Sequence, residues 1–111
     1  MQALALGWGH SCALLSGGEA RCWGDNNTGQ LGNGTVEEQH TPVAVLASPG
    51  GPPLVGVQAL ALGILHSCAW IGGGDVRCWG FNFYGQLGTG DTADRPTPVP
   101  VQFEPGGGGA P

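Results

Sequence analysis

The chain has 111 residues, the length of one small domain, and only 10% of them are charged, whereas 23 are glycine. Three basic residues against eight acidic ones give a formal net charge of −5, so we expect neither nucleic-acid binding nor attachment to an anionic membrane surface. No apolar run approaches the ~20 residues that a membrane-spanning helix needs.

Four short strands are predicted in the first part of the chain, because apolar runs there are separated by turn residues. They lie near residues 2–6, 10–15, 19–23 and 42–46. The second and third strands flank Ser16-Gly17-Gly18, which suits a three-residue hairpin loop with glycine in the left-handed conformation. This hairpin register places Cys12 directly opposite Cys22. No segment shows a helical period, so the chain is predicted to be all-β.

The whole pattern returns 56 residues further on, so residues 3–45 align with residues 59–101 without a gap. Of the 43 aligned pairs, 25 are identical, which establishes an internal duplication. We therefore divide the chain into a first repeat (1–46), a linker rich in proline and glycine (47–58), a second repeat (59–103) and a flexible tail (104–111).

Four strands in each repeat predict two four-stranded antiparallel blades of a β-propeller. A single blade cannot bury both of its apolar faces, and two blades leave two faces and two strand edges open. We therefore expect a fragment of a larger ring, or a piece that self-associates through its open blade faces.

Three motifs make the chain similar to the regulator of chromosome condensation repeat family, in the cysteine-containing form of bacterial proteins. They are Leu6-Gly7-Trp8-Gly9-His10-Ser11, Trp23-Gly24-Asp25-Asn26 and Gly29-Gln30-Leu31-Gly32-Asn33-Gly34, and each has its counterpart in the second repeat. Leu6 and Leu62 depart from the family, which usually has a small residue at that step. The resemblance implies a propeller of about seven blades and a framework role for His10 and His66.

Each repeat holds two cysteines on facing strands, Cys12 with Cys22 and Cys68 with Cys78. The duplicated spacing and register favour two cross-strand disulfides, and these in turn favour an extracellular or cell-surface location. Four buried free thiols are the alternative. A zinc site is disfavoured, because the close Cys-x-x-Cys spacing of structural zinc sites is absent.

The other duplicated residues are assigned structural roles. His10 and His66 lack a nucleophile or a carboxylate at a matching spacing, so we expect them to bond a neighbouring backbone carbonyl rather than to act as general bases. The same reasoning makes Trp23 and Trp79 packing residues, Asn26 and Asn82 turn residues, and Leu14 and Trp70 core residues. Residues 29–34 lack the Gly-Lys-Ser/Thr of a phosphate-binding loop. The chain is accordingly predicted to have no cofactor, no metal and no enzymatic activity.

Partner contacts are sought where the two repeats differ, because framework residues recur and binding residues need not. Phe81, Phe83 and Tyr84 replace Asp25, Asn27 and Thr28 of the first repeat, and aromatic side chains in loops are favoured at interfaces. Trp8 lies between a strand and its following histidine, where the family has a propeller rim. These four aromatic residues are the candidate partner-binding residues, and packing on a neighbouring blade or on the linker is the alternative for the loop aromatics.

The function predicted from the sequence is a protein–protein interaction scaffold with an unidentified protein partner. Two alternatives come from the resemblance. A sensory propeller of the ultraviolet-B receptor type would carry Trp-Arg before the histidine, whereas this chain has Trp8-Gly9 and Ile64-Leu65. A guanine nucleotide exchange regulator would be nuclear and basic, which conflicts with the disulfides and the negative charge.

Overall fold

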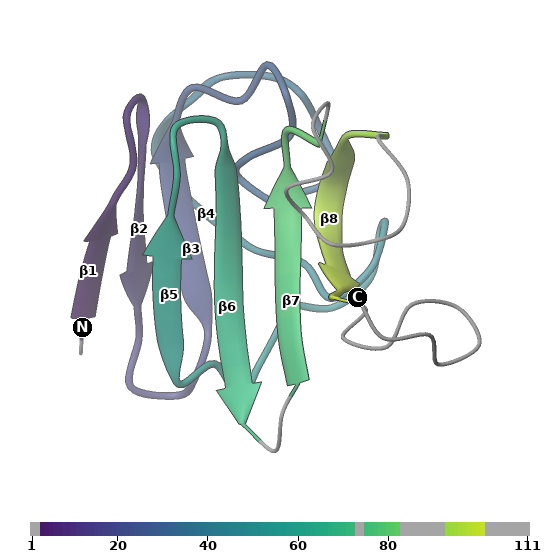
Figure 1. Ribbon diagram of the computed structural model, residues 1–111. Helices are drawn as coiled ribbons and strands as arrows, with labels where there is room; N and C mark the ends of the chain where they lie inside the picture. The colour runs from purple at the N-terminus through teal and green to yellow at the C-terminus, as the bar shows by residue number, and fades with distance from the viewer. Residues whose placement is uncertain (1–2, 73–74, 83–92, 102–111) are drawn as a thin grey trace.

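Two four-stranded antiparallel sheets make up the computed structural model, which describes residues 3–72, 75–82 and 93–101 (Figure 1). The first sheet, blade 1, holds β1 (Ala3–Leu6), β2 (His10–Leu14), β3 (Ala20–Gly24) and β4 (Gln39–Ala44). The second sheet, blade 2, holds β5 (Ala59–Leu62), β6 (His66–Gly72), β7 (Asp75–Gly80) and β8 (Arg95–Pro100). This is the all-β pair of blades that the sequence predicts, and no helix within the described ranges could span a membrane.

Each blade is a meander in which every strand pairs with the next one along the chain. Cys12 pairs with Cys22 and Cys68 with Cys78, as the hairpin register predicts. The fourth strand starts earlier than predicted, because β4 pairs from Gln39 opposite Gly24 across a register shift in β3. The Val45 N–H still bonds the Ala20 carbonyl at 3.0 Å, and the chain then turns so that Leu46 pairs with Pro53 of the linker.

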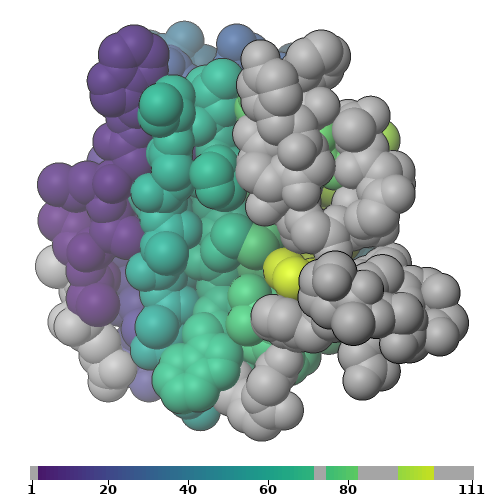
Figure 2. All heavy atoms as spheres, viewed as in Figure 1, coloured from purple at the N-terminus to yellow at the C-terminus, as the bar shows by residue number. Residues whose placement is uncertain are grey.

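The apolar core lies between the two blades. Cys12, Leu14, Cys22 and Val45 of the first repeat pack there with Ala69 and Trp79 of blade 2, and all are at most 5% exposed. The edge strands β1 and β5 run side by side, and Figure 2 shows the spheres of β1 in purple beside those of β5 in teal. Most of the burial therefore arises where the blades meet.

The linker contributes to this core instead of merely joining the blades. Leu54 and Val57 are each only 5% exposed and belong to the same apolar cluster. The Val57 backbone N–H donates to the Gly18 carbonyl at 3.0 Å, which ties the linker to the first hairpin. Blade 2 is thus held against blade 1 by the linker as well as by its own side chains.

The connections β1–β2, β3–β4 and β5–β6 all emerge at one end of the molecule, the upper end in Figure 1. We call this end the upper rim, and its described residues are 7–9, 25–38 and 63–65 together with Phe81, Asn82, Ala93 and Asp94.

Candidate protein-interaction rim and the blade interface

A buried hydrogen-bond cluster joins the blades beneath the upper rim. Ser67 Oγ donates to the Gln30 carbonyl at 2.8 Å, and Trp79 Nε1 donates to the same oxygen at 2.9 Å. Because the hydroxyl has a single proton and gives it to Gln30, His10 Nε2, at 2.8 Å from Ser67 Oγ, must be the donor of that contact. One carbonyl of blade 1 thus accepts two hydrogen bonds from blade 2.

The protonation of His10 is fixed by this geometry. With the proton on Nε2, the neutral ring leaves Nδ1 bare, and Nδ1 is buried without a hydrogen-bond partner in the described part of the chain. A second proton would place a charge on a ring that is largely removed from solvent, which burial disfavours. Burial lowers the pKa of His10, and nearby His66 lowers it further, although Asp25 and a hydrogen bond to the His66 backbone oppose this. Burial also lowers the pKa of His66.

The structure agrees with most of the predicted framework roles. It differs from the prediction in the partner of His10 and in the burial of Trp23 and Trp70. His10 does fix the blades, but its hydrogen bond goes to a side chain of the next blade instead of to a backbone carbonyl. Trp79 is completely buried between the blades, whereas Trp23 is only half-buried. Leu14 fills the core as predicted, but Trp70 is 47% exposed, because no described blade covers its face.

The long β3–β4 loop is ordered by Asn26, which is 1% exposed. Its Nδ2 donates to the carbonyls of Thr35 and Glu37, each at 3.0 Å, and its Oδ1 accepts the Leu31 N–H at 2.9 Å. Asn82 repeats the role in blade 2 by donating from Nδ2 to the Ala93 carbonyl at 2.9 Å. These asparagines bond the local backbone as predicted, and so they hold the rim loop in one conformation.

Two disulfides cross the hairpins, Cys12–Cys22 and Cys68–Cys78, each with a sequence separation of 10 residues. The first is inaccessible, since both of its cysteines are 0% exposed. In the second, Cys78 is buried but Cys68 is partly exposed on the far face of blade 2. The part of the chain that the structure describes has no free cysteine and no group of three acidic, histidine or cysteine side chains able to hold a metal ion.

Trp8 is the most exposed large apolar side chain of the described chain, at 82%. The next residue, Gly9, accepts the Asp25 N–H at 2.9 Å, and the Asp25 carboxylate lies against the α-carbon of Gly9. A side chain at Gly9 would therefore collide with Asp25. Trp8 and Asp25 are thus neighbours on the upper rim, and Trp8 projects into solvent.

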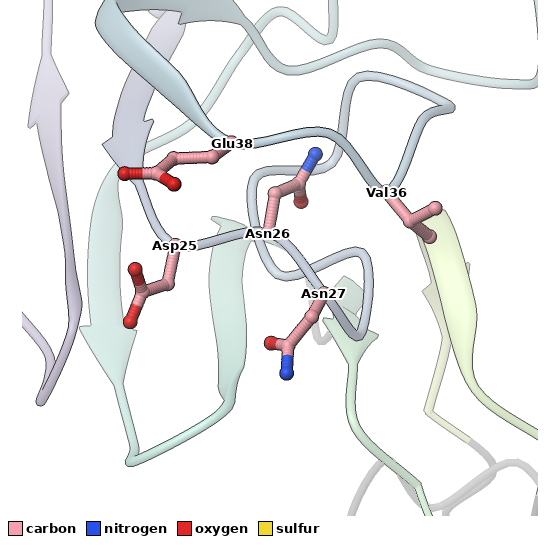
Figure 3. A pocket seen from close by; sticks show the side chains of 5 residues that line it. All are labelled: Asp25, Asn26, Asn27, Val36 and Glu38. Atoms are coloured by element: carbon pink, nitrogen blue, oxygen red, sulfur yellow. The ribbon is translucent and has the colours of Figure 1, made fainter.

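Asp25 also lines an open pocket of about 400 Å³ on the rim. Its lining residues are Asp25, Asn26, Asn27, Val36 and Glu38 (Figure 3). The side chains of Asp25 and Glu38 extend to the same side of the loop, and Val36 lies at the other end of the pocket with 59% of its surface exposed. The rim therefore combines two carboxylates with exposed apolar groups.

The candidate partner-binding residues fall into two groups. Trp8 is on the rim, and Phe81 is half-buried there, with its N–H bonded to the Leu65 carbonyl at 2.9 Å. Phe83 and Tyr84 lie outside the described residues. Sequence reasoning missed Ile64, which is 59% exposed at the position equivalent to Trp8, although its place in the repeat could have indicated it.

Two adjoining four-stranded meanders, bonded blade to blade through duplicated residues, define a protein built of β-propeller blades. The chain belongs to the regulator of chromosome condensation (RCC1) repeat family, because models of that repeat match residues 2–30, 18–70 and 73–108. The match over 18–70 begins before β3 of blade 1 and ends in β6 of blade 2. The sequence repeat of the family thus includes strands of two neighbouring blades.

Curated relatives are much longer than this chain. The Arabidopsis thaliana ultraviolet-B receptor UVR8 is 36% identical over 91% of the chain and 22% of that protein. The human probable E3 ubiquitin-protein ligase HERC4 is 41% identical over 86% of the chain and 9% of that protein. The chain spans about a fifth or less of these relatives.

Solved structures share the arrangement of the blades. Human WBSCR16 superposes with a TM-score of 0.79 at 26% identity, over 96% of this chain and 26% of that one. Prp20p of Saccharomyces cerevisiae superposes with a TM-score of 0.67 at 26% identity, over 89% and 24% respectively. Prp20p is a protein that binds Gsp1p and histones.

Proposed function

We propose that this chain is a non-catalytic protein-interaction scaffold whose partner docks on the upper rim at Trp8. The observation that carries the proposal is the 82% exposure of Trp8 on a rim whose backbone is held by buried hydrogen bonds. A large aromatic side chain on a rigid support binds at a small loss of conformational entropy, which is why tryptophan is frequent among the residues that dominate interfaces.

The chemistry of the rim favours a partner that is basic and apolar together. Trp8, Ile64 and Val36 supply apolar surface, and Asp25 and Glu38 supply two carboxylates in an open pocket. The chain as a whole carries −5, so long-range attraction also favours a cationic partner. We infer that a lysine or arginine of the partner enters the pocket while an apolar side chain contacts Trp8.

The compartment is part of the proposal. We propose a secreted or surface-exposed protein, because a pair of disulfides persists in an oxidising environment and is rare in reducing ones. Mass spectrometry after alkylation of the protein in its cells of origin tests this. Two intact disulfides are expected, whereas four alkylated cysteines would place the chain in a reducing compartment.

Binding is tested by chemical cross-linking and capture of partners with four versions of the chain. Trp8→Ala and the double variant Asp25→Asn with Glu38→Gln should each lose the captured protein. Val55→Ala is the matched control, since it removes another exposed apolar side chain, which lies in the segment that joins the blades and not on the rim. Equal capture by Trp8→Ala and the unchanged chain would reject docking at the rim.

A further inference from the structure

The contact between the two blades shows which faces of a blade fit together. We call the face that blade 2 turns toward blade 1 its leading face, and the face that blade 1 turns toward blade 2 its trailing face. On the leading face of blade 2, Leu60 and Leu62 pack against the interblade core, and Ser67 and Trp79 donate to blade 1. On the trailing face of blade 1, Cys12, Leu14 and Cys22 are buried beneath blade 2.

The leading face of blade 1 carries the same side chains but nothing covers them in the described chain. Leu4 and Leu6, the counterparts of Leu60 and Leu62, are 51% and 67% exposed. Ser11 and Trp23, the counterparts of Ser67 and Trp79, are half-buried and make no side-chain hydrogen bond to any described residue. The two exposed leucines and the two unbonded donors are thus equivalent to the side chains that dock blade 2 onto blade 1.

The trailing face of blade 2 is also uncovered by any described residue of another blade. A hollow of about 160 Å³ lies on it, and none of the described residues that line it is charged. Its lining includes Ala59 and Ala61 of β5, Cys68 and Trp70 of β6, and Val76 of β7, which the strand register places on one face of the sheet. In blade 1 the counterparts of Cys68 and Trp70 are the buried Cys12 and Leu14. His66 stands where His10 stands, and its ring has no hydrogen bond to a described residue.

We propose that a second copy of this chain docks its leading face on the trailing face of blade 2, head to tail. Leu4 and Leu6 of the incoming copy enter the hollow, and His66 donates from Nε2 to Ser11 Oγ of that copy. The contact would repeat the one already seen between the blades, in which the equivalent leucines pack and the equivalent histidine and serine bond. Gln86 matches Gln30 in the sequence and lies outside the described residues.

Such a contact joins different surfaces of the two copies, so each copy keeps one free face of each kind. Addition of further copies then closes a ring or continues as an open chain, depending on the rotation between copies. Every contact uses one leading and one trailing face. A variant that blocks only its leading face therefore prevents all assembly of that variant, although its trailing face remains intact.

Two variants test this arrangement, and each places a negative charge on one of the two faces that the contact would bury. Leu6→Glu blocks the leading face, and Trp70→Glu blocks the trailing face, because a carboxylate would be desolvated in an apolar contact. Val55→Glu is the matched control, since Val55 is 60% exposed in the segment that joins the blades. Sedimentation velocity over a concentration series measures the mass of each variant, and circular dichroism checks that each is folded.

The unchanged chain and Val55→Glu should exceed the 11.2 kDa chain mass as concentration rises, whereas each face variant alone should stay at that mass. A mixture of the two face variants should form a complex of twice the chain mass and nothing larger, because Trp70→Glu retains a leading face and Leu6→Glu a trailing one. The proposal is overturned if the unchanged chain stays monomeric up to its solubility limit, if either face variant alone still assembles, or if the mixture stays monomeric. The upper rim takes no part, so its binding test is independent.

Discussion

Nε2 of His10 in blade 1 lies 2.8 Å from Oγ of Ser67 in blade 2 and donates a hydrogen bond to it. The two residues are 57 positions apart, one more than the repeat, because Ser67 is the counterpart of the residue that follows His10. The duplicated His-Ser pair is therefore split between blades, with the histidine of one blade bonding the serine of the next. This arrangement sets the register of one blade against its neighbour.

Ser67→Ala is expected to destabilise the folded chain by about 1–3 kcal/mol, since it leaves His10 Nε2 as a buried donor without an acceptor. Ser11→Ala is the control within the same motif, because Ser11 is half-buried and its hydroxyl bonds no described residue. It should change stability by less than about 0.5 kcal/mol. Urea unfolding at concentrations where the chain is monomeric measures both, and equal effects would contradict the assigned role of Ser67.

Stability should fall as pH drops below about 6.5. The pKa of His10 is lowered in the folded chain, so at such a pH the unfolded chain binds protons that the folded chain does not, and protonation favours unfolding. The stabilisation is fully present above pH 6.5 and is lost as pH falls toward the lowered pKa of His10. Urea midpoints between about pH 8 and pH 5 measure the loss.

His10→Gln should reduce this pH dependence, and His66 should account for part of what remains, since its pKa is lowered as well. His40→Gln serves as the control, because the side chain of His40 is 83% exposed. A pH dependence that survives His10→Gln unchanged but disappears in His40→Gln would show that the buried histidine is not its source.

The two disulfides should differ in their resistance to reduction. Cys68 is partly exposed, whereas both sulfurs of Cys12–Cys22 belong to residues that are 0% exposed, so a thiol reagent reaches Cys68–Cys78 first. Timed alkylation with peptide mass spectrometry at low dithiothreitol concentration follows each pair. Replacing either pair by alanine should lower the free energy of unfolding by about 2–3 kcal/mol. Simultaneous reduction of both pairs would mean that the blades separate before either disulfide reacts.

Gly32→Ala should destabilise the chain by at least about 1–2 kcal/mol. Gly32 has a φ of +73°, and a Cβ there would lie 2.8 Å from Trp79 Nε1 and 3.0 Å from Val45. The substitution therefore strains the backbone and pushes on the indole that bonds Gln30. Gly17→Ala is the matched control, since no atom lies within 4 Å of its Cβ position and its φ is not positive. Thermal unfolding should show a clearly lower Tm for Gly32→Ala than for Gly17→Ala.

Much of the fold could be predicted because the repeat is duplicated. Two copies of the same turns and alternating strands define the hairpin register, so the pairing of Cys12 with Cys22 follows from sequence alone and is confirmed. The start of β4 could not be placed, because its pairing at Gln39 depends on a register shift in β3 that has no signature in the sequence. The burial of Leu54 and Val57 was missed for a similar reason, since a segment rich in proline and glycine is typical of a flexible linker.

The sequence by itself determined the repeat, the strands, the cysteine pairs and the aromatic residue of the rim, because these depend on local turns and on a spacing of 56 residues. Only the tertiary structure decided which copy of each duplicated residue is buried against a neighbouring blade. Leu6 and Leu62, Trp23 and Trp79, and Ser11 and Ser67 are equivalent in sequence, yet the second of each pair is the more buried. The physical reason is that burial arises from the contact between blades, and of the two leading faces within the described chain only that of blade 2 has a neighbour.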